Sequence, residues 1–300
     1  MKVLITGATG TIGSKLVELC HQKGWSVNYL TTNKTKLQNR DNFKGFYWNP
    51  KQNEIDQSCL QDVDAVFHLV GASIAKRWTS DYKKEILKSR VQTTKLLHKT
   101  IEEGNYSVKK VVSASAIGIY PTSLTNYYDE NHAEINPSFL GEVVNKWESE
   151  VDTFKSLNIE VTKLRIGIVL SENSGALVKM AKPIKFGLGA AFGNGKQWQS
   201  WIHIDDLVSM FIYAMENDIK GVVNAVAPNP VTNLELTKAI AKQIKRPLIL
   251  PNIPKAILSL ILGEMHIILF ESQRVSSKKI ESLGFNFKHY NLKAGLADLL

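Results

Sequence analysis

Short apolar runs alternate along the chain with longer segments in which apolar residues recur at helical spacing. Runs of about four to eight residues predict buried strands, and the longer amphipathic segments predict helices. We expect strands at residues 2–6, 26–31, 65–69, 110–114, 160–166 and 222–225, and long helices at about 80–102 and 138–157. This order is typical of an α/β fold with a Rossmann-type, doubly wound parallel sheet covered by helices on both faces.

The pattern loosens beyond residue 170. A glycine-rich passage runs from Gly187 to Gly195, and strand-like residues return at 201–206. Thr232 is placed to cap a helix, and mainly short helices follow it. We therefore predict a Rossmann domain over 1–170, completed by about 203–228, and a smaller, mainly helical lobe made of 171–202 and 229–300.

The chain is basic, and its Lys and Arg residues are scattered along the sequence. Its 300 residues include 37 Lys and Arg against 28 Asp and Glu, which gives a formal net charge of +9. Such a charge can favour nucleic acid, anionic lipid or phosphorylated small molecules. Because no basic run is interleaved with aromatic residues, we expect no nucleic-acid partner and interpret the charge as mostly solvated surface.

Cysteine use and hydropathy predict a cytoplasmic protein. Cys20 and Cys59 have neither metal-site spacing nor the pattern of a disulfide framework. The first residues enter a strand-like run without the apolar core of a signal peptide. The apolar stretch 257–270 is interrupted by Glu264 and His266 and is shorter than the roughly 20 residues of a membrane span. We expect no membrane partner and interpret this stretch as a buried helix or a subunit contact, such as that of a homodimer.

A glycine turn follows the first expected strand directly. Gly7, Gly10 and Gly13 lie between that strand and a helix. Glycine lets the backbone approach a pyrophosphate closely, and the free N–H groups at the start of the helix attract the anion. The sequence therefore predicts a dinucleotide site at this turn, whose lining also includes Thr9, Thr11 and Ile12.

The end of the second expected strand favours NADP(H) over NAD(H). An acidic residue at this place would bind the ribose hydroxyls of NAD and repel a 2′-phosphate. The strand ends instead in Thr31 and Thr32, followed by Asn33 and Lys34. We predict that Thr31 and Thr32 contact NADP(H), although Lys34 can equally be an ordinary surface charge.

The glycine spacing and seven further segments resemble the extended short-chain dehydrogenase/reductases. The likeness is to an atypical branch, the bacterial and mitochondrial epimerase-like proteins, and it covers nearly the whole chain. The segments are 68–72, 76–78, 85–94, 113–120, 146–148, 200–206 and 224–230. The resemblance implies that Leu69 and Val70 pass the adenosine side of the cofactor, that Glu85 and Arg90 lie near it, and that Ile168 borders the nicotinamide.

The resemblance also exposes a departure at the reaction centre. Hydride-transferring relatives use a Tyr as acid/base, a Lys four residues later to lower its pKa, and a Ser or Thr to hold the substrate oxygen. Ser115 matches the last of these, but the Tyr and Lys positions hold Leu140 and Val144. We take Ser115 and Glu142 as candidate catalytic residues, while Glu142 can equally be a helix surface residue.

Two functions remain open. The chain is either an NADP-dependent oxidoreductase or epimerase-like enzyme acting on an unknown small molecule, which we favour, or a non-catalytic NADP(H)-binding module that reports redox state. We interpret His203 as a structural imidazole and the following Asp205 and Asp206 as helix caps. No group of His, Cys and carboxylate residues has metal-ligand spacing, so we expect no metal.

Overall fold

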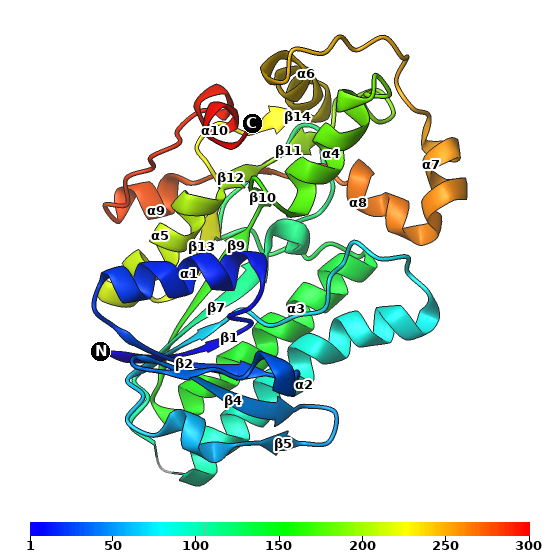
Figure 1. Ribbon diagram of the computed structural model, residues 1–300. Helices are drawn as coiled ribbons and strands as arrows, with labels where there is room; N and C mark the ends of the chain where they lie inside the picture. The colour runs from blue at the N-terminus through cyan, green and yellow to red at the C-terminus, as the bar shows by residue number, and fades with distance from the viewer. Residues whose placement is uncertain (105) are drawn as a thin grey trace.

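The computed structural model describes residues 1–104 and 106–300 and is built around one mostly parallel sheet (Figure 1). Seven parallel strands lie in the order β13-β9-β7-β6-β1-β2-β4. In chain order they are β1 (Lys2–Thr6), β2 (Ser26–Thr31), β4 (Phe43–Asn49), β6 (Ala65–His68), β7 (Lys110–Ala116), β9 (Glu160–Ile166) and β13 (Gly221–Ala225). The predicted α/β, Rossmann-type fold is confirmed.

Strand β4 was not among the predicted strands. It lies near the edge of the sheet, where β3 (Asn39–Arg40) and β5 (Glu54–Ile55) pair with it antiparallel. Of its seven residues only Trp48 is buried, so its sequence lacks both an apolar run and a clean alternation.

Helices cover both faces of the sheet. Figure 1 shows α1 (Thr11–Gln22) and α5 (Ile204–Glu216) on one face, and α2 (Ser80–Gly104) and α3 (Phe139–Val151) on the other. The structure divides the predicted helix at 138–157 into α3 and a 3₁₀ helix, Asp152–Leu157. The main core lies between these layers, and its central residues Val3, Leu4 and Ile5 of β1 are fully buried.

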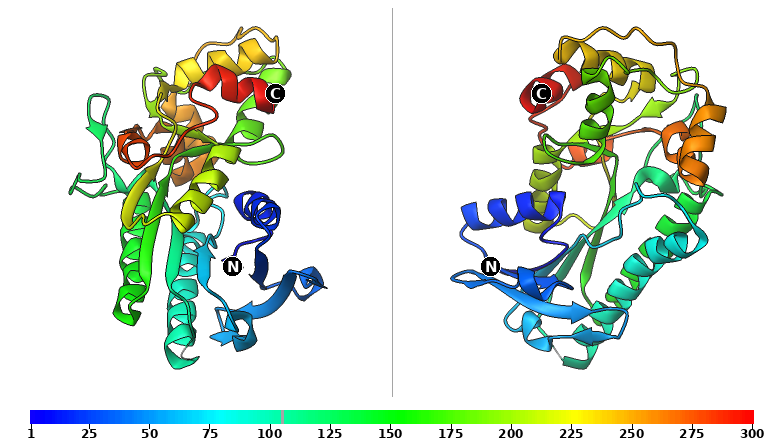
Figure 2. Two further views of the ribbon diagram at one scale, coloured as in Figure 1. Left: turned by 90° about the vertical axis from the view of Figure 1, so that its left-hand side faces the viewer. Right: turned by 45° about the vertical axis from the view of Figure 1, so that its right-hand side comes forward.

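A smaller lobe lies at one end of the sheet (Figure 2). Its helices are α4 (Gly175–Lys185), α6 (Asn233–Gln243), α7 (Lys255–Leu262), α8 (Ile267–Phe270), α9 (Lys278–Ser282) and α10 (Leu292–Leu299). Two short strand pairs join it to the domain: β10 (Ile168–Leu170) with β12 (Trp201–His203), and β15 (Arg274–Val275) with β8 (Tyr127–Tyr128). A third pair, β11 (Trp198–Gln199) with β14 (Val231–Thr232), lies within the lobe. Thr232 caps α6 as predicted, in a capping box with Glu235.

The interpretation of residues 257–270 as a buried helix is wrong, because Leu258 alone among them is buried; the alternative, a subunit contact, stays a prediction. In α7 only Leu258 is buried, while Ile257, Leu260 and Ile261 are exposed. Among the described residues, no helix combines the length and the apolarity needed to cross a bilayer.

Asp206 ties the C-terminal segment to the domain instead of capping α5. Its buried carboxylate accepts hydrogen bonds from the backbone N–H groups of Lys288 (2.7 Å) and His289 (2.9 Å), and lies 3.1 Å from His289 Nδ1. The cap of α5 is His203, whose Nδ1 accepts from the Asp205 N–H. His203, Asp206 and His289 lie close enough to hold a metal ion, but the Asp206 carboxylate already accepts from the N–H groups of Lys288 and His289, and His203 Nδ1 caps α5. We therefore interpret the cluster as structural.

Replacing Asp206 with Ala should destabilise the fold by about 2–4 kcal/mol, because it leaves buried backbone donors without an acceptor. Asp205→Ala is the matched control. Among the described residues the Asp205 carboxylate forms long ion pairs with Lys15 (3.7 Å) and Lys288 (3.9 Å), so the loss should stay below about 1 kcal/mol. Denaturant unfolding of both variants measures the difference. Equal, small losses of unfolding free energy in the two variants would favour the interpretation of both carboxylates as helix caps.

Candidate functional site

The glycine turn between β1 and α1 is shaped by close backbone approach. Gly7 has a φ of +75°, and a Cβ there would lie 3.2 Å from the backbone carbon of Leu69. At Gly13 a Cβ would lie 2.2 Å from the Gly7 oxygen, whereas at Gly10 its nearest neighbour would be that oxygen at 3.3 Å. Gly7 and Gly13 are therefore required by packing, and Gly10 keeps the outer side of the turn free of a side chain.

The start of α1 has no side-chain cap. Gly10 is the N-cap, and none of the side chains that the structure describes accepts from the first-turn amides. These N–H groups have no partner within a helix, and the positive end of the helix dipole lies beside them. Thr9 and Thr11 are exposed around this turn, Ile12 is half-buried, and the Thr11 hydroxyl lies 2.7 Å from that of Ser174. The turn thus presents amides suited to an anion.

A buried network fixes the exit of β6 beside this turn. Thr6 Oγ1 accepts from the N–H groups of Leu69 (3.0 Å) and Val70 (3.3 Å) and lies 3.0 Å from His68 Nδ1. His68 Nε2 lies 3.0 Å from the Thr94 hydroxyl. Burial lowers the pKa of His68 to about 4, so its ring is neutral near pH 7. The backbone of Leu69 and Val70 is thereby held next to Gly7.

A cavity of about 690 Å³ opens at the ends of β2, β4 and β6. Its lining includes Thr32, Val70 and Glu85, which the sequence singled out. It also includes residues that sequence analysis missed: Trp48, Asn49, Pro50, Lys51, Lys88 and Ser89. The aromatic segment that became β4 was the available signal for the first four.

The two threonines at the end of β2 differ in position. Thr31 is buried, and its hydroxyl accepts from the Asn33 N–H at 3.1 Å. Thr32 is exposed and lines the cavity. Lys34 lies with its ammonium 4.8 Å from the centre of the Tyr47 ring. Of these residues, only Thr32 is among those that line the cavity.

Glu85 and Arg90 approach the same strand exit from α2. Glu85 lines the cavity and pairs with Lys51 at 3.1 Å. The Arg90 guanidinium lies against Gly71, donates to the carbonyl oxygens of Ile86 (2.9 Å) and Ala72 (3.2 Å), and stacks on the Trp147 ring. It forms no ion pair with any residue that the structure describes, and burial lowers its pKa to about 10. A partly buried cation without a carboxylate partner among the described residues favours an anionic ligand.

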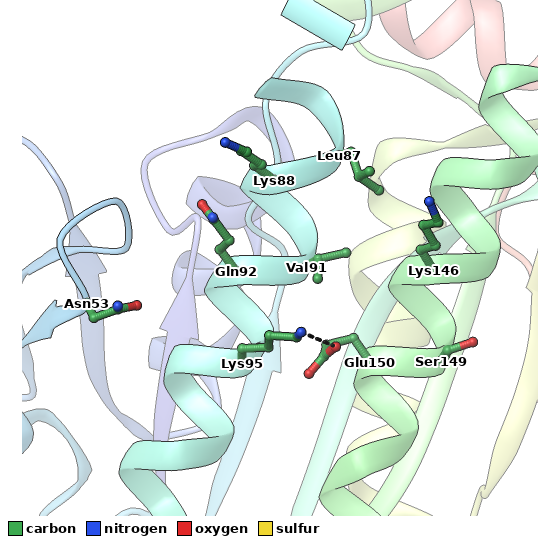
Figure 3. A pocket seen from close by; sticks show the side chains of 9 residues that line it. All are labelled: Asn53, Leu87, Lys88, Val91, Gln92, Lys95, Lys146, Ser149 and Glu150. Carbon is green, nitrogen blue, oxygen red and sulfur yellow. Dashed lines mark ion pairs between the residues drawn. The ribbon is translucent and has the colours of Figure 1, made fainter. Parts of the chain in front are cut away.

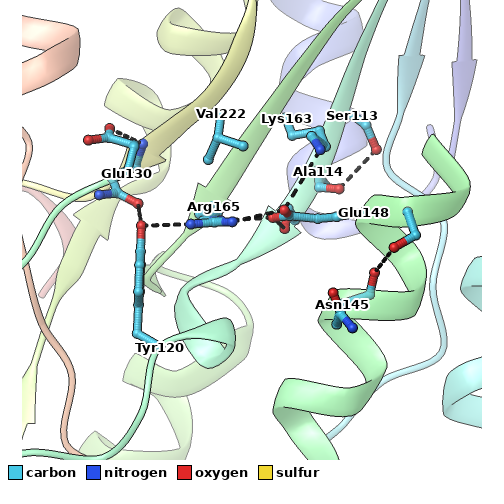
Figure 4. Close-up of polar contacts among 12 residues, drawn as sticks. Ser113, Ala114, Tyr120, Glu130, Asn145, Glu148, Lys163, Arg165 and Val222 are labelled. Atoms are coloured by element: carbon cyan, nitrogen blue, oxygen red, sulfur yellow. Dashed lines mark hydrogen bonds and ion pairs between the residues drawn. The ribbon is translucent and has the colours of Figure 1, made fainter. Parts of the chain in front are cut away.

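Ser115 of β7 belongs to a buried polar network with Glu148 of α3 and Arg165 of β9, and Figure 4 shows the last two side chains. Its hydroxyl donates to Glu148 at 2.5 Å, and Arg165 holds both oxygens of that carboxylate at 2.9 Å. Burial alone would lower the pKa of Arg165, but the hydrogen bonds and charge of Glu148 raise it overall. Arg165 also donates to Tyr120, whose pKa burial raises to about 12. The Ser115 hydroxyl proton is therefore committed to Glu148.

The positions of the missing Tyr and Lys are apolar in structure as well as in sequence. Leu140 packs in a cluster with Trp78 and Ile86, against which Tyr82 and Met265 also pack. Val144 packs in a second cluster with Ile117 and Tyr120. Neither position offers a group that can transfer a proton.

The structure does not bring Glu142 to Ser115. The Glu142 side chain is 53% exposed on α3 and accepts from Lys146 at 2.7 Å. Lys146 lines a polar groove of about 610 Å³ between α2 and α3, crossed by the Lys95–Glu150 pair (Figure 3). This is the placement of a helix surface residue, the alternative that the sequence left open for Glu142.

Comparison with known families gives matches over most of the chain. The model described as the NAD dependent epimerase/dehydratase family matches residues 3–226, and a domain of unknown function, DUF1731, matches 253–299. An epimerase family protein of Staphylococcus aureus (strain MRSA252) is 35% identical over 298 residues, which are 99% of this chain and 98% of that protein. An epimerase family protein of Staphylococcus epidermidis (strain RP62A) is also 35% identical, over 100% of this chain and 99% of its own.

Solved structures agree with these matches. The human epimerase family protein SDR39U1 (isoform 2), crystallised with NADPH, has a TM-score of 0.86 and 29% identity, covering 100% of this chain and 99% of its own. The UDP-glucuronic acid 4-epimerase of Bacillus cereus, in complex with UDP-glucuronic acid and NAD, has a TM-score of 0.80 with 20% identity, covering 100% and 98%. This second likeness concerns the fold alone.

Glu148→Gln should destabilise the protein by about 3–5 kcal/mol, because it leaves the buried Arg165 charge without its partner. Glu142→Gln on the same helix is the control and should change stability by less than about 0.5 kcal/mol, since its ion pair is exposed. Urea unfolding measures both. Equal effects of the two changes would contradict the placement of Glu148 in the buried network.

Proposed function

Since the chain belongs to the NAD dependent epimerase/dehydratase family, as an atypical, epimerase-like short-chain dehydrogenase/reductase, we propose that it binds NADP(H) at the carboxyl edge of its parallel sheet. The observation that carries this proposal is the glycine turn, where the uncapped first-turn amides of α1 lie beside a backbone that has no room for side chains at Gly7 and Gly13. Parallel sheets of this type bind nucleotides where the strand order reverses, and here that is between β1 and β6.

The pyrophosphate would lie on the turn. Gly10 leaves the approach open, and the amides of Thr11, Ile12 and Gly13 would donate to the phosphate oxygens. Thr9 would line the same turn. A side chain at the cap would take one of these donors, so its absence supports a ligand in its place.

The adenosine half would occupy the cavity beyond β2 and β6. Leu69 and Val70 would contact it through their backbone, which Thr6 holds in place. Glu85 lies in the cavity wall, and Arg90, which pairs with no carboxylate of the described residues, lies behind Gly71. A phosphate of the cofactor would supply the negative charge that Arg90 lacks.

The preference for NADP(H) rests on the residues around Thr32. Lys51 and Lys88 line the cavity with Thr32, and the strand end carries no carboxylate. The ammonium groups and the hydroxyl suit a 2′-phosphate. The Thr31 hydroxyl accepts a hydrogen bond from the Asn33 N–H and would contribute by fixing the backbone at the end of β2. Ile168, half-buried at the start of β10, would border the nicotinamide.

Thr32→Glu should weaken NADPH binding by at least about tenfold and NADH binding much less, because a carboxylate repels the 2′-phosphate. Thr35→Glu, which adds the same charge at an exposed position that is not part of the cavity lining, is the control. Fluorescence titration of both reduced cofactors measures the two affinities. Equal losses for NADPH and NADH would remove the basis for the NADP preference, and no saturable binding of either would remove the proposal.

The first candidate function is that of an oxidoreductase or epimerase-like enzyme, which would use the bound cofactor in its reaction. The nicotinamide would give or take a hydride, and the chain must then move a proton at the substrate oxygen. Ser115 could hold that oxygen only if its hydroxyl turned from Glu148. Glu142 remains the acid proposed from the sequence. Tyr82 is a second candidate, because it packs in the cluster around Leu140 and its hydroxyl donates to the Ser73 oxygen at 2.6 Å.

A non-catalytic NADP(H)-binding module is the second candidate. The observation that favours it is that Leu140 and Val144 are packed in apolar clusters while Ser115 is committed to Glu148. Such a module would bind the cofactor and change its affinity for a partner without turnover.

A screen of carbonyl compounds and sugar nucleotides with NADPH separates the two candidates. For an enzyme we expect substrate-dependent loss of the reduced nicotinamide absorbance, reduced about a hundredfold or more by Tyr82→Phe and also reduced by Ser115→Ala. Glu142→Gln should have the smallest effect, because its carboxylate is exposed and paired. NADPH binding without turnover across the screen would favour the binding module. Turnover that all three variants retain would show that the reaction uses other residues.

A further inference from the structure

The excess positive charge of the chain is concentrated in two segments of the smaller lobe. Residues 171–202 and 229–262 contain nine Lys and Arg against two Glu, which accounts for seven of the nine net charges. Among the described residues, none of these nine cations lies within ion-pair distance of a carboxylate, whereas many lysines of the Rossmann domain are paired. The smaller lobe therefore carries an unneutralised field.

The same segments hold the most exposed apolar side chains. Five large apolar residues of the described chain are more than 60% exposed, and all five lie here: Phe186, Leu188, Ile249, Leu260 and Ile261. With Ile257, we call these six residues the apolar face. In α7 the exposed members are at positions 257, 260 and 261, the spacing of one side of a helix.

The parts of the apolar face lie along one edge of the lobe. Phe192 pairs with Ile253, and Leu188 lines a small apolar pocket together with Ile253, so the loops after α4 and after α6 lie side by side. Helix α7 begins directly after the second loop, and Figures 1 and 2 show it at the outer side of the lobe.

Cations immediately precede each part of the apolar face. Lys182 and Lys185 lie in the last turn of α4 before Phe186, Lys245 and Arg246 precede the loop that carries Ile249, and Lys255 is the first residue of α7. Exposed apolar side chains with basic residues beside them are the pattern of helices that lie in a membrane interface. Lysine stems can cover apolar surface while their ammonium groups reach anionic headgroups.

We propose that the apolar face binds the surface of an anionic phospholipid bilayer, an interaction beyond the proposed function. A second copy is disfavoured because a two-fold contact through this face would bring two strongly positive lobes together. The expectation of no membrane partner rested on the length of 257–270, which excludes a span but not a helix lying on the surface.

Vesicle flotation of the full-length chain tests this proposal. Vesicles of equal parts phosphatidylcholine and phosphatidylglycerol should carry the protein, vesicles of phosphatidylcholine alone should carry at least about tenfold less, and raised salt should release it. Lys182→Glu with Lys185→Glu, and separately Leu260→Ser with Ile261→Ser, should each reduce binding at least about tenfold. The controls are Lys36→Glu with Lys44→Glu on the Rossmann domain, and Leu124→Ser at another exposed apolar position.

Thermal unfolding and NADPH titration show that the variants are folded and that this test is independent of the cofactor site. Equal binding to both kinds of vesicle, or binding that the lobe variants retain, would overturn the proposal. So would a dimer in sedimentation velocity that Leu260→Ser with Ile261→Ser dissociates while the wild type binds no vesicles, because the apolar face would then be a contact between copies.

Discussion

The close approach of the first β–α turn to the exit of β6 is the constraint on which the candidate site depends. Gly7 can lie against Leu69 and Val70 only because it has no Cβ, and Gly13 allows α1 to begin against Gly7. Thr6 and His68 hold the other side of this contact through buried hydrogen bonds. The uncapped amides, the cavity wall and Arg90 beside Gly71 are all placed by this one packing arrangement.

The polar groups around Ser115 bind one another, whereas those of the proposed nucleotide site are open to a ligand. Glu148, Arg165, Ser115 and Tyr120 form a fully partnered polar network, which a fold must keep because an unpaired buried charge is costly. Leu140 and Val144 stand where the family's proton-transferring pair would be, and apolar neighbours surround both. The chain therefore keeps Ser115 within a buried polar network, while Leu140 and Val144 are part of apolar clusters.

Features that reside in a single local segment could be predicted from the sequence. The turn at Gly7–Gly13, the cap at Thr232 and six strands of the sheet depend on local backbone chemistry and periodicity. Features that require distant segments to meet could not. Lys51 and Lys88 join Thr32 only because β2 and β4 end at one cavity and α2 runs along its wall. Asp206 accepts from the backbone of Lys288 and His289, which are distant in the sequence. Hydropathy also cannot tell whether an apolar helix such as α7 will be covered.

Because Arg90 has no carboxylate partner among the described residues, binding of the proposed ligand should affect the stability of the folded protein. A partly buried guanidinium without a carboxylate partner among the described residues costs free energy in the protein without cofactor, and a bound dinucleotide phosphate would offset that cost, so stability would rise with the logarithm of cofactor concentration. The oxidised and reduced coenzymes carry the same phosphates. Arg90 would thus report the total size of the coenzyme pool, and any discrimination between its two redox forms would have to arise at the other end of the ligand, around Ile168.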